Sequence, residues 1–128
     1  DCLLSRGLGD VYKRQVEMDG NLTQTPEFPY NWMYDGSRPQ MPGFEMEITC
    51  KSLFLIFKDS GEMDVGKADV FVNDVYCMTA DPHKNNWLHC NAVLLFWETE
   101  SRSHKVRITV TEEDQNKKFT ILGFGYTI

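Results

Sequence analysis

The sequence predicts an all-β protein, an antiparallel β-sandwich of about seven strands with no significant helix. Two observations lead to this prediction. From residue 44 onward, several segments alternate between apolar and polar side chains, as strands with one buried face do. Polar turns separate these segments at the short intervals typical of a sandwich. A chain of 128 residues is long enough for one domain with one hydrophobic core.

The expected strands can be justified in chain order. Residues 44–50 alternate and indicate a half-buried strand, whereas residues 52–58 are apolar on both faces and indicate a central strand. Asn73 and Asp74 stand between two β-branched runs and tolerate positive φ, which predicts a two-residue hairpin turn. The later strands are expected at residues 75–78, 92–97, 104–110 and 119–128, with polar turns at 98–103 and 112–117.

The last strand is the most distinctive segment. Residues 119–128 are apolar and aromatic, with two glycines and no charged side chain. A strand of this composition is expected to be buried on both faces and to close the core.

The N-terminal third does not follow the strand pattern. Residues 1–15 show neither alternation nor a helical stripe, and they resemble translated adapter sequence of the kind found at the ends of metagenomic assemblies. They are either non-native, in which case the natural protein extends upstream of Val16, or a natural but poorly ordered terminus. Residues 16–43 contain four prolines and are expected to form an extended lead-in, not a regular element, that packs on the sandwich through its aromatic side chains. The sandwich domain is expected at residues 44–128.

Composition and charge exclude some functions. There are 13 Lys and Arg against 19 Asp and Glu, a net charge of −6, and the basic residues are scattered. We therefore expect no nucleic-acid partner, because phosphate binding requires clustered cations. No apolar run approaches the roughly 20 residues of a membrane span, so we expect no membrane partner.

The cysteines favour free thiols. Setting Cys2 aside, Cys50, Cys77 and Cys90 remain, an odd number without a C-x-x-C pair. Reduced, buried thiols point toward a cytoplasmic or anaerobic setting, but an exported bacterial protein is equally compatible, so the compartment stays open.

Several segments together resemble a known family. The chain is similar to the jelly-roll-like β-sandwich ancillary domain of SGNH/GDSL-type hydrolases, which are carbohydrate-esterase-like enzymes of gut bacteria. The resemblance covers residues 28–128. The segments that carry it are WMYDG (32–36), LFL (53–55), ADVFVN (68–73), NNW (85–87), VLLF (93–96), HKVRI (104–108) and KFTILGFGYT (118–127). It implies that the ester chemistry belongs to a separate α/β catalytic domain, which would be this chain's partner, with an acylated glycan as a second possible partner.

The catalytic blocks of that family are not found in this chain. They are a Gly-Asp-Ser block with the nucleophile and an Asp-x-x-His block with the base. The nearest segments are Gly9-Asp10-Val11, Asp35-Gly36-Ser37 and Asp81-Pro82-His83, and none has the required order or spacing. We therefore expect no catalytic residues and no enzymatic activity from this chain alone.

Two groups of side chains contain residue types that can bind metal ions. His83, His89 and Cys90 share one loop but lack a fourth ligand in paired spacing, so a polar loop is the simpler interpretation. A second group, of carboxylates, lacks the spacing of a calcium-binding loop, so these side chains are interpreted as solvated residues of turns. This second group consists of Asp59, Glu62, Asp64 and Asp69. No metal or other cofactor is expected.

Aromatic side chains raise the possibility of carbohydrate binding. Trp87 beside Asn85 and Asn86 is the best candidate, since sugar rings stack on exposed aromatic faces while amides bind hydroxyls. Trp32 and Tyr34 are further candidates, although packing inside the protein explains all of these aromatics equally well. Trp97 follows an apolar strand and is expected in the core.

The sequence thus predicts a non-catalytic accessory sandwich that supports a catalytic domain or its substrate recognition. The alternative is a stand-alone carbohydrate-binding module. A third possibility is a protein-interaction domain, which would expose an apolar patch, with Trp32 and Tyr34 as possible members.

Overall fold

The computed structural model describes residues 2–4, 32–36, 43–84 and 90–128 of the chain. The strands are β1 (Cys2–Leu4), β2 (Trp32–Asp35), β3 (Phe44–Lys58), β4 (Ala68–Val72), β5 (Val75–Ala80), β6 (Cys90–Val110) and β7 (Lys118–Thr127), with one 3₁₀ turn, η1 (Glu112–Asp114). All pairings between these strands are antiparallel. The described residues contain no α-helix, and none of their helical segments is long and apolar enough to cross a membrane. The expected all-β antiparallel class is confirmed.

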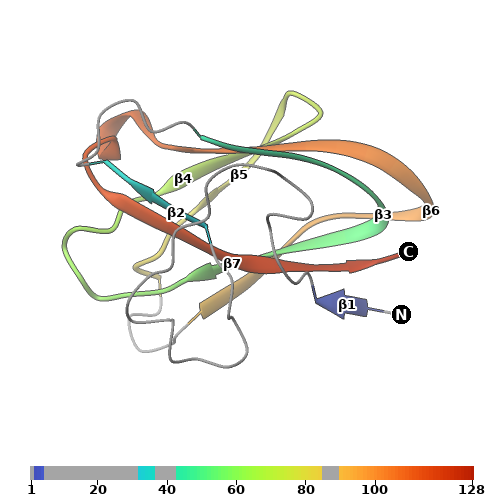
Figure 1. Cartoon of the computed structure of the whole chain (residues 1–128), viewed down its shortest axis with the longest axis horizontal. Coiled ribbons are helices and arrows are strands. Elements are labelled where there is room, and N and C mark those ends of the chain that lie inside the picture. The colour runs from blue at the N-terminus through green and yellow to red at the C-terminus, as the bar shows by residue number, and fades with distance from the viewer. Residues whose placement is uncertain (1, 5–31, 37–42, 85–89) are drawn as a thin grey trace.

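The strands form one continuous sheet in the order β1-β7-β3-β6-β4-β5, with β2 also paired to β7. The long strands β3 and β6 curve around at one end of the molecule, so the two ends of the sheet come to lie over each other (Figure 1). Residues 44–50 of β3 pair with the second half of β6, and residues 52–58 pair with its first half and with β7. Because the described strands make one hydrogen-bonded sheet, the jelly-roll sandwich itself stays a prediction.

The polar turn expected at residues 98–103 is wrong. β6 runs without a break through this segment, and its ladder with β3 continues as Thr49 opposite Ser103 and Cys50 opposite Arg102. The polar composition of the segment agrees with its exposure, because residues 99–103 are exposed and Glu98 is half-buried. Likewise, the expected boundary after Cys50 is a register shift inside one strand. Exposed strand and turn have the same composition here, and only the long-range pairing separates them.

The lead-in contains a regular element after all. Trp32–Asp35 forms β2 along β7, with Trp32 opposite Ile121, so the expectation of a segment without regular structure is wrong at these residues. Alternation explains the strand, because Trp32 and Tyr34 face the core while the residues between them are half-buried. Cys2–Leu4 also pairs with β7. The rest of residues 1–31 lies outside the described part of the chain, and the proposed domain boundaries stay predictions.

The core is built around β7. Every residue of 119–125 is buried, which confirms that this strand is covered on both faces until the chain reaches Tyr126. Phe124 stacks on Phe44 with ring centroids 5.7 Å apart, and Phe119 stacks on Phe57 at 5.6 Å. The first contact joins β7 to the far end of β3, which pairs with β6, whereas the second lies between the paired segments of β3 and β7. Together with the burial of residues 119–125, they show that β7 closes the core as the sequence predicts.

The two-residue hairpin between β4 and β5 is confirmed. Asn73 and Asp74 have φ values of 52° and 65°, and the flanking Val72 and Val75 are directly paired. Positive φ at both central residues matches the right-handed twist of the strands, which is why Asn and Asp suit these positions.

Candidate functional site

The residues predicted to bind a ligand divide into two groups. Asn85, Asn86 and Trp87 lie outside the described residues. Trp32 and Tyr34 are buried, with exposed fractions of 3% and 8%.

The contacts of the second group are those of core residues. Trp32 meets Phe44 edge to face at 5.5 Å, and the Tyr34 hydroxyl donates to the carbonyl of Gln115 at 3.0 Å. These contacts leave no broad ring face of Trp32 or Tyr34 open to solvent, and the ligand role of all five residues stays a prediction.

The expectation that Trp97 belongs to the core is wrong, because its side chain is 81% exposed. Trp97 lies opposite Ser52 and Leu94 lies opposite Phe54, so both project from the same outer face of the sheet. Simple alternation would place residues 94 and 97 on opposite faces. A register shift at Leu95 adds one residue to β6 and turns both side chains outward.

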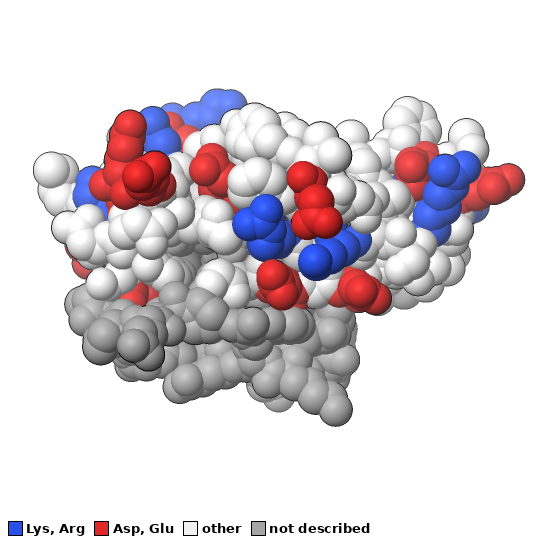
Figure 2. Space-filling model, turned by 90° about the horizontal axis from the view of Figure 1, so that it is seen from above, with Lys and Arg blue, Asp and Glu red and all other residues white. Residues whose placement is uncertain are grey.

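These side chains form an apolar outer face on β3 and β6. Within it, Leu94 is 49% exposed, Ala92 is exposed and the side chains of β3 are half-buried. We call the following set the apolar outer face: Phe54, Ile56, Ala92, Leu94 and Trp97. By contrast, Figure 2 shows the molecule from above with acidic and basic side chains intermixed among neutral surface.

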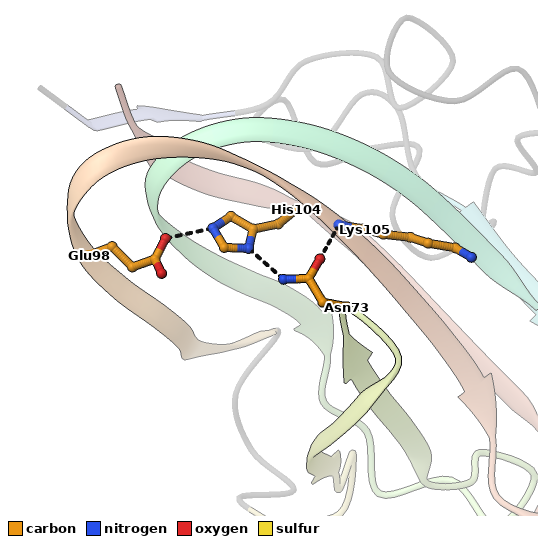
Figure 3. Close-up of polar contacts among 4 residues, drawn as sticks. All are labelled: Asn73, Glu98, His104 and Lys105. Atoms are coloured by element: carbon orange, nitrogen blue, oxygen red, sulfur yellow. Dashed lines mark hydrogen bonds and ion pairs between the residues drawn. The ribbon is translucent and has the colours of Figure 1, made fainter.

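A polar cluster lies inside the bend of β6, where it ties the β4–β5 turn to that strand (Figure 3). His104 is 7% exposed, and its Nε2 lies 2.7 Å from a carboxylate oxygen of Glu98. Its Nδ1 lies 2.9 Å from the side-chain amide nitrogen of Asn73. The backbone N–H of Lys105 donates to Asn73 Oδ1 at 3.0 Å, and the Asn73 N–H donates to the Lys105 carbonyl at 2.8 Å.

These bonds determine the tautomer of His104. Since the Asn73 oxygen accepts from Lys105, its amide nitrogen must donate to Nδ1, and the ring proton is on Nε2 facing Glu98. Both ring nitrogens are therefore engaged, so His104 cannot take a proton from a nucleophile without losing a bond. The cluster is therefore a structural contact that connects the β4–β5 turn to β6.

The candidate metal ligands do not converge. Asp59 accepts a hydrogen bond from Asn91, Asp64 pairs with Lys118 at 3.5 Å and Asp69 accepts from Thr79. Among the described residues, no three His, Cys, Asp or Glu side chains are placed to hold a metal ion. His83 closes a local turn by donating its N–H to Asp81, whereas His89 lies outside the described residues.

The three described cysteines are free thiols, as expected. Burial raises the pKa of all three above the ordinary value, and the charge of Glu98 raises that of Cys50 further. A raised pKa keeps the thiol protonated and makes it a poor nucleophile near neutral pH. Cys50, Cys77 and Cys90 therefore lack the thiolate character that a catalytic cysteine requires.

A polar cavity of about 390 Å³ opens near the 3₁₀ turn η1. Its walls include Tyr34, Asp69, Thr109, Glu112 and Gln115. The Gln115 amide is fixed by donating to the Val110 carbonyl at 2.6 Å, so this wall is preformed. Hydroxyl, carboxylate and amide groups around an open cavity suit a ligand that carries hydroxyl groups.

Comparisons with known proteins give fold neighbours only. No family model matches the sequence, and no curated protein sequence matches it closely. The structure is similar to a family two carbohydrate esterase from Cellvibrio japonicus, with a TM-score of 0.56 at 12% identity over 98% of this chain and 30% of that chain. It is also similar to a two-domain esterase active on acetylated mannans, co-crystallised with mannopentaose, with a TM-score of 0.57 at 12% identity over 76% of this chain and 27% of that chain.

These neighbours indicate the fold of this chain and how much of a longer esterase it corresponds to in length. At such identities the likeness concerns the fold alone, and it agrees with the coarse expectation of a β-sheet domain that occurs in carbohydrate esterases. The chain spans less than a third of the length of either neighbour.

Proposed function

We propose that this chain is a non-catalytic accessory β-sandwich of an SGNH/GDSL-type carbohydrate esterase. In this role it supports the catalytic domain and contributes to recognition of an acylated glycan. The fold neighbours support the proposal, since each is an esterase of which a domain like this one accounts for less than a third. The chemistry of the described residues agrees, because His104 is fully engaged and the thiols have raised pKa values.

The apolar outer face is the observation that carries the supporting role. Trp97 is largely exposed and Leu94 is half exposed on the same face of the sheet, beside half-buried side chains of β3. A tryptophan buries about 150–250 Å² when it is covered, which at about 25 cal/mol per Å² amounts to about 4–6 kcal/mol before the costs of association. Exposed apolar surface of this kind usually marks an interface, and a neighbouring domain would cover it.

The alternative, a stand-alone carbohydrate-binding module, has its own support in the polar cavity beside η1. The two roles predict different behaviour of Trp97. If the apolar outer face docks on a catalytic domain, a polar residue at position 97 should weaken that contact. If the glycan site lies elsewhere on the molecule, the same substitution should leave the affinity for glycan unchanged.

The test begins with the coding sequence that flanks this chain. We expect a Gly-Asp-Ser block and an Asp-x-x-His block in the same reading frame. In the longer protein, Trp97→Ser should lower the thermal midpoint of the catalytic domain by several degrees, because it removes the anchor of the contact. Met63→Ser is the matched control, since Met63 is 86% exposed and lies outside the face.

Two results would contradict the proposal. One is a flanking sequence without either block. The other is a Trp97→Ser protein whose catalytic domain unfolds at the same temperature as the Met63→Ser control.

A further inference from the structure

A second surface lies on β4, β5 and the end of β6, away from the apolar outer face. Its organisation depends on a bulge in β5. Val70 is opposite Met78 and Phe71 is opposite Tyr76, so Cys77 is an extra residue between the two pairs. Cys77 and Met78 both pack toward the core, which leaves Tyr76 and Thr79 projecting outward on the same face.

The position of the Tyr76 side chain is fixed by a chain of hydroxyl hydrogen bonds. Its hydroxyl lies 2.7 Å from Thr79 Oγ1, and Thr79 donates its own proton to Asp69 Oδ1 at 2.6 Å. The Tyr76 hydroxyl must therefore be the donor in the first bond. The residue is nevertheless 56% exposed, so an immobilised aromatic ring faces solvent. Immobilisation before binding reduces the entropy that a ligand contact would otherwise cost.

Phe71 and Arg107 extend this surface across the sheet. The Phe71 ring meets Tyr76 edge to face, with centroids 6.0 Å apart. The guanidinium of Arg107 lies over the Phe71 ring, 4.2 Å from its centroid. Among the described residues Arg107 forms no ion pair, so its N–H groups remain available as donors. We call Asp69, Phe71, Tyr76, Thr79 and Arg107 the β4–β5 platform.

Asp69 joins the platform to the polar cavity. Its carboxylate accepts from Thr79 on one side and lines the cavity with Thr109, Glu112 and Gln115 on the other. The surface thus runs from an exposed aromatic ring, past a carboxylate and a hydroxyl, into an opening of about 390 Å³. That volume lies in the range of small-ligand sites, which is about 300–1,000 Å³.

We propose that the β4–β5 platform and the adjoining cavity bind a neutral oligosaccharide. One sugar ring stacks its C–H face on Tyr76, and hydroxyls of the same or the next ring bind Asp69, Thr79 and Arg107. The inference rests on the substrate-recognition part of the proposed function. Apart from Tyr34, which lines the cavity, the residues that it identifies for that role differ from the aromatic side chains indicated by the sequence.

Other classes of ligand fit this surface less well. A purely apolar partner would bury the charge of the Asp69 carboxylate with the Thr79 hydroxyl as its donor but offer it no donor of its own, which is costly. A phosphate-rich partner would meet Asp69 and Glu112 within the same opening, where like charges repel. A hydroxyl-rich neutral ligand can donate to the Asp69 carboxylate, accept from Arg107 and cover the Tyr76 ring.

The test is a titration of the purified chain, followed by backbone amide NMR, with linear pentasaccharides of mannose, xylose and glucose. We expect at least one to bind with a dissociation constant in the millimolar range or below, and to shift amide signals of β4 and β5. Tyr76→Ala should weaken that affinity tenfold or more. Tyr76→Phe keeps the ring and should stay within about threefold of the native value. Val75→Ala is the matched control, since Val75 is 68% exposed on the same strand and outside the platform.

Three outcomes would overturn the inference, and each has a different consequence for the proposed function. Unchanged affinity in Tyr76→Ala would show that the platform is not the site. Affinity lost in Trp87→Ala but kept in Tyr76→Ala would move recognition to the loop predicted from the sequence and leave the recognition role standing. No binding of any pentasaccharide at 20 mM, roughly twenty times a millimolar dissociation constant, would overturn both the platform and the recognition role. That result would leave the supporting role untouched, because it is carried by Trp97.

Discussion

Replacing Asn73 should separate the energy of the β4–β5 turn from that of the His104 cluster. Asn73 does two things: it adopts a φ of 52°, and its side chain bonds His104 Nδ1 and the Lys105 N–H. Asn73→Gly keeps the backbone conformation but removes both side-chain bonds. Asn73→Ala removes the bonds and also places a residue with a Cβ atom at positive φ.

The expected magnitudes follow from these contacts. Each side-chain hydrogen bond contributes about 0.5–1.5 kcal/mol, and the bond to Lys105 is solvent-exposed, so Asn73→Gly should cost about 1–2 kcal/mol. The left-handed conformation adds about 1 kcal/mol or more for alanine, so Asn73→Ala should cost about 2–4 kcal/mol.

The measurement is the free energy of unfolding from urea titrations, followed by far-ultraviolet circular dichroism. Native stability in Asn73→Gly would refute the argument, because it would mean that the cluster adds nothing beyond the turn. Equal losses in the glycine and alanine variants would refute the part that concerns backbone conformation.

Three further predictions concern packing and charge. Gly36→Ala should destabilise the fold by about 1–3 kcal/mol in the same urea assay, because a Cβ at Gly36 would lie 2.2 Å from the Gln115 carbonyl oxygen; a native midpoint would contradict the close approach. Phe57→Ala should cost about 3–5 kcal/mol, since Phe57 is 2% exposed and stacked on Phe119, and a loss below about 1 kcal/mol would mean that β7 does not close the core. The pKa of Asp114 is held below its ordinary value, first by the Lys67 N–H that it accepts, so its stabilising effect is present above that value and is lost as the pH falls through the lowered pKa. The stability difference between native protein and Asp114→Asn should therefore be constant above about pH 5 and shrink in more acidic buffer, and a difference that grows in acid would reverse the sign of the argument.

Local patterns predicted those features of the fold that depend on local chemistry. The Asn73-Asp74 turn is an example, because the preference for positive φ belongs to the two residues themselves. The burial of residues 119–125 is another, since a strand without charged side chains has no face suited to water.

The wrong predictions concern residues whose structure depends on pairing with strands far away in the sequence. Trp97 faces solvent because of a one-residue register shift at Leu95, and alternation alone carries no sign of that shift. Within residues 98–103, Arg102 and Ser103 pair with β3, whereas the polar composition of the segment is equally typical of a turn. The alternation in Trp32–Asp35 is too short to predict a strand by itself, and the pairing with β7 is what stabilises one there.

The β4–β5 platform escaped the sequence analysis for the same reason. The bulge at Cys77 brings Tyr76 and Thr79 onto one face, and Phe71 and Arg107 come from two other strands. The pair Phe71 and Tyr76 around the Asn73 turn is the one signal that could have pointed there, because cross-strand aromatic pairs flank many hairpins.

The most direct test of the central claim, that this chain is an accessory module without catalysis of its own, is an assay of the purified chain on simple acetyl esters, alone and after treatment with a serine-reactive reagent. We predict hydrolysis no faster than in buffer, with or without the reagent. Turnover that the reagent abolishes would contradict the claim and place a catalytic serine within this chain.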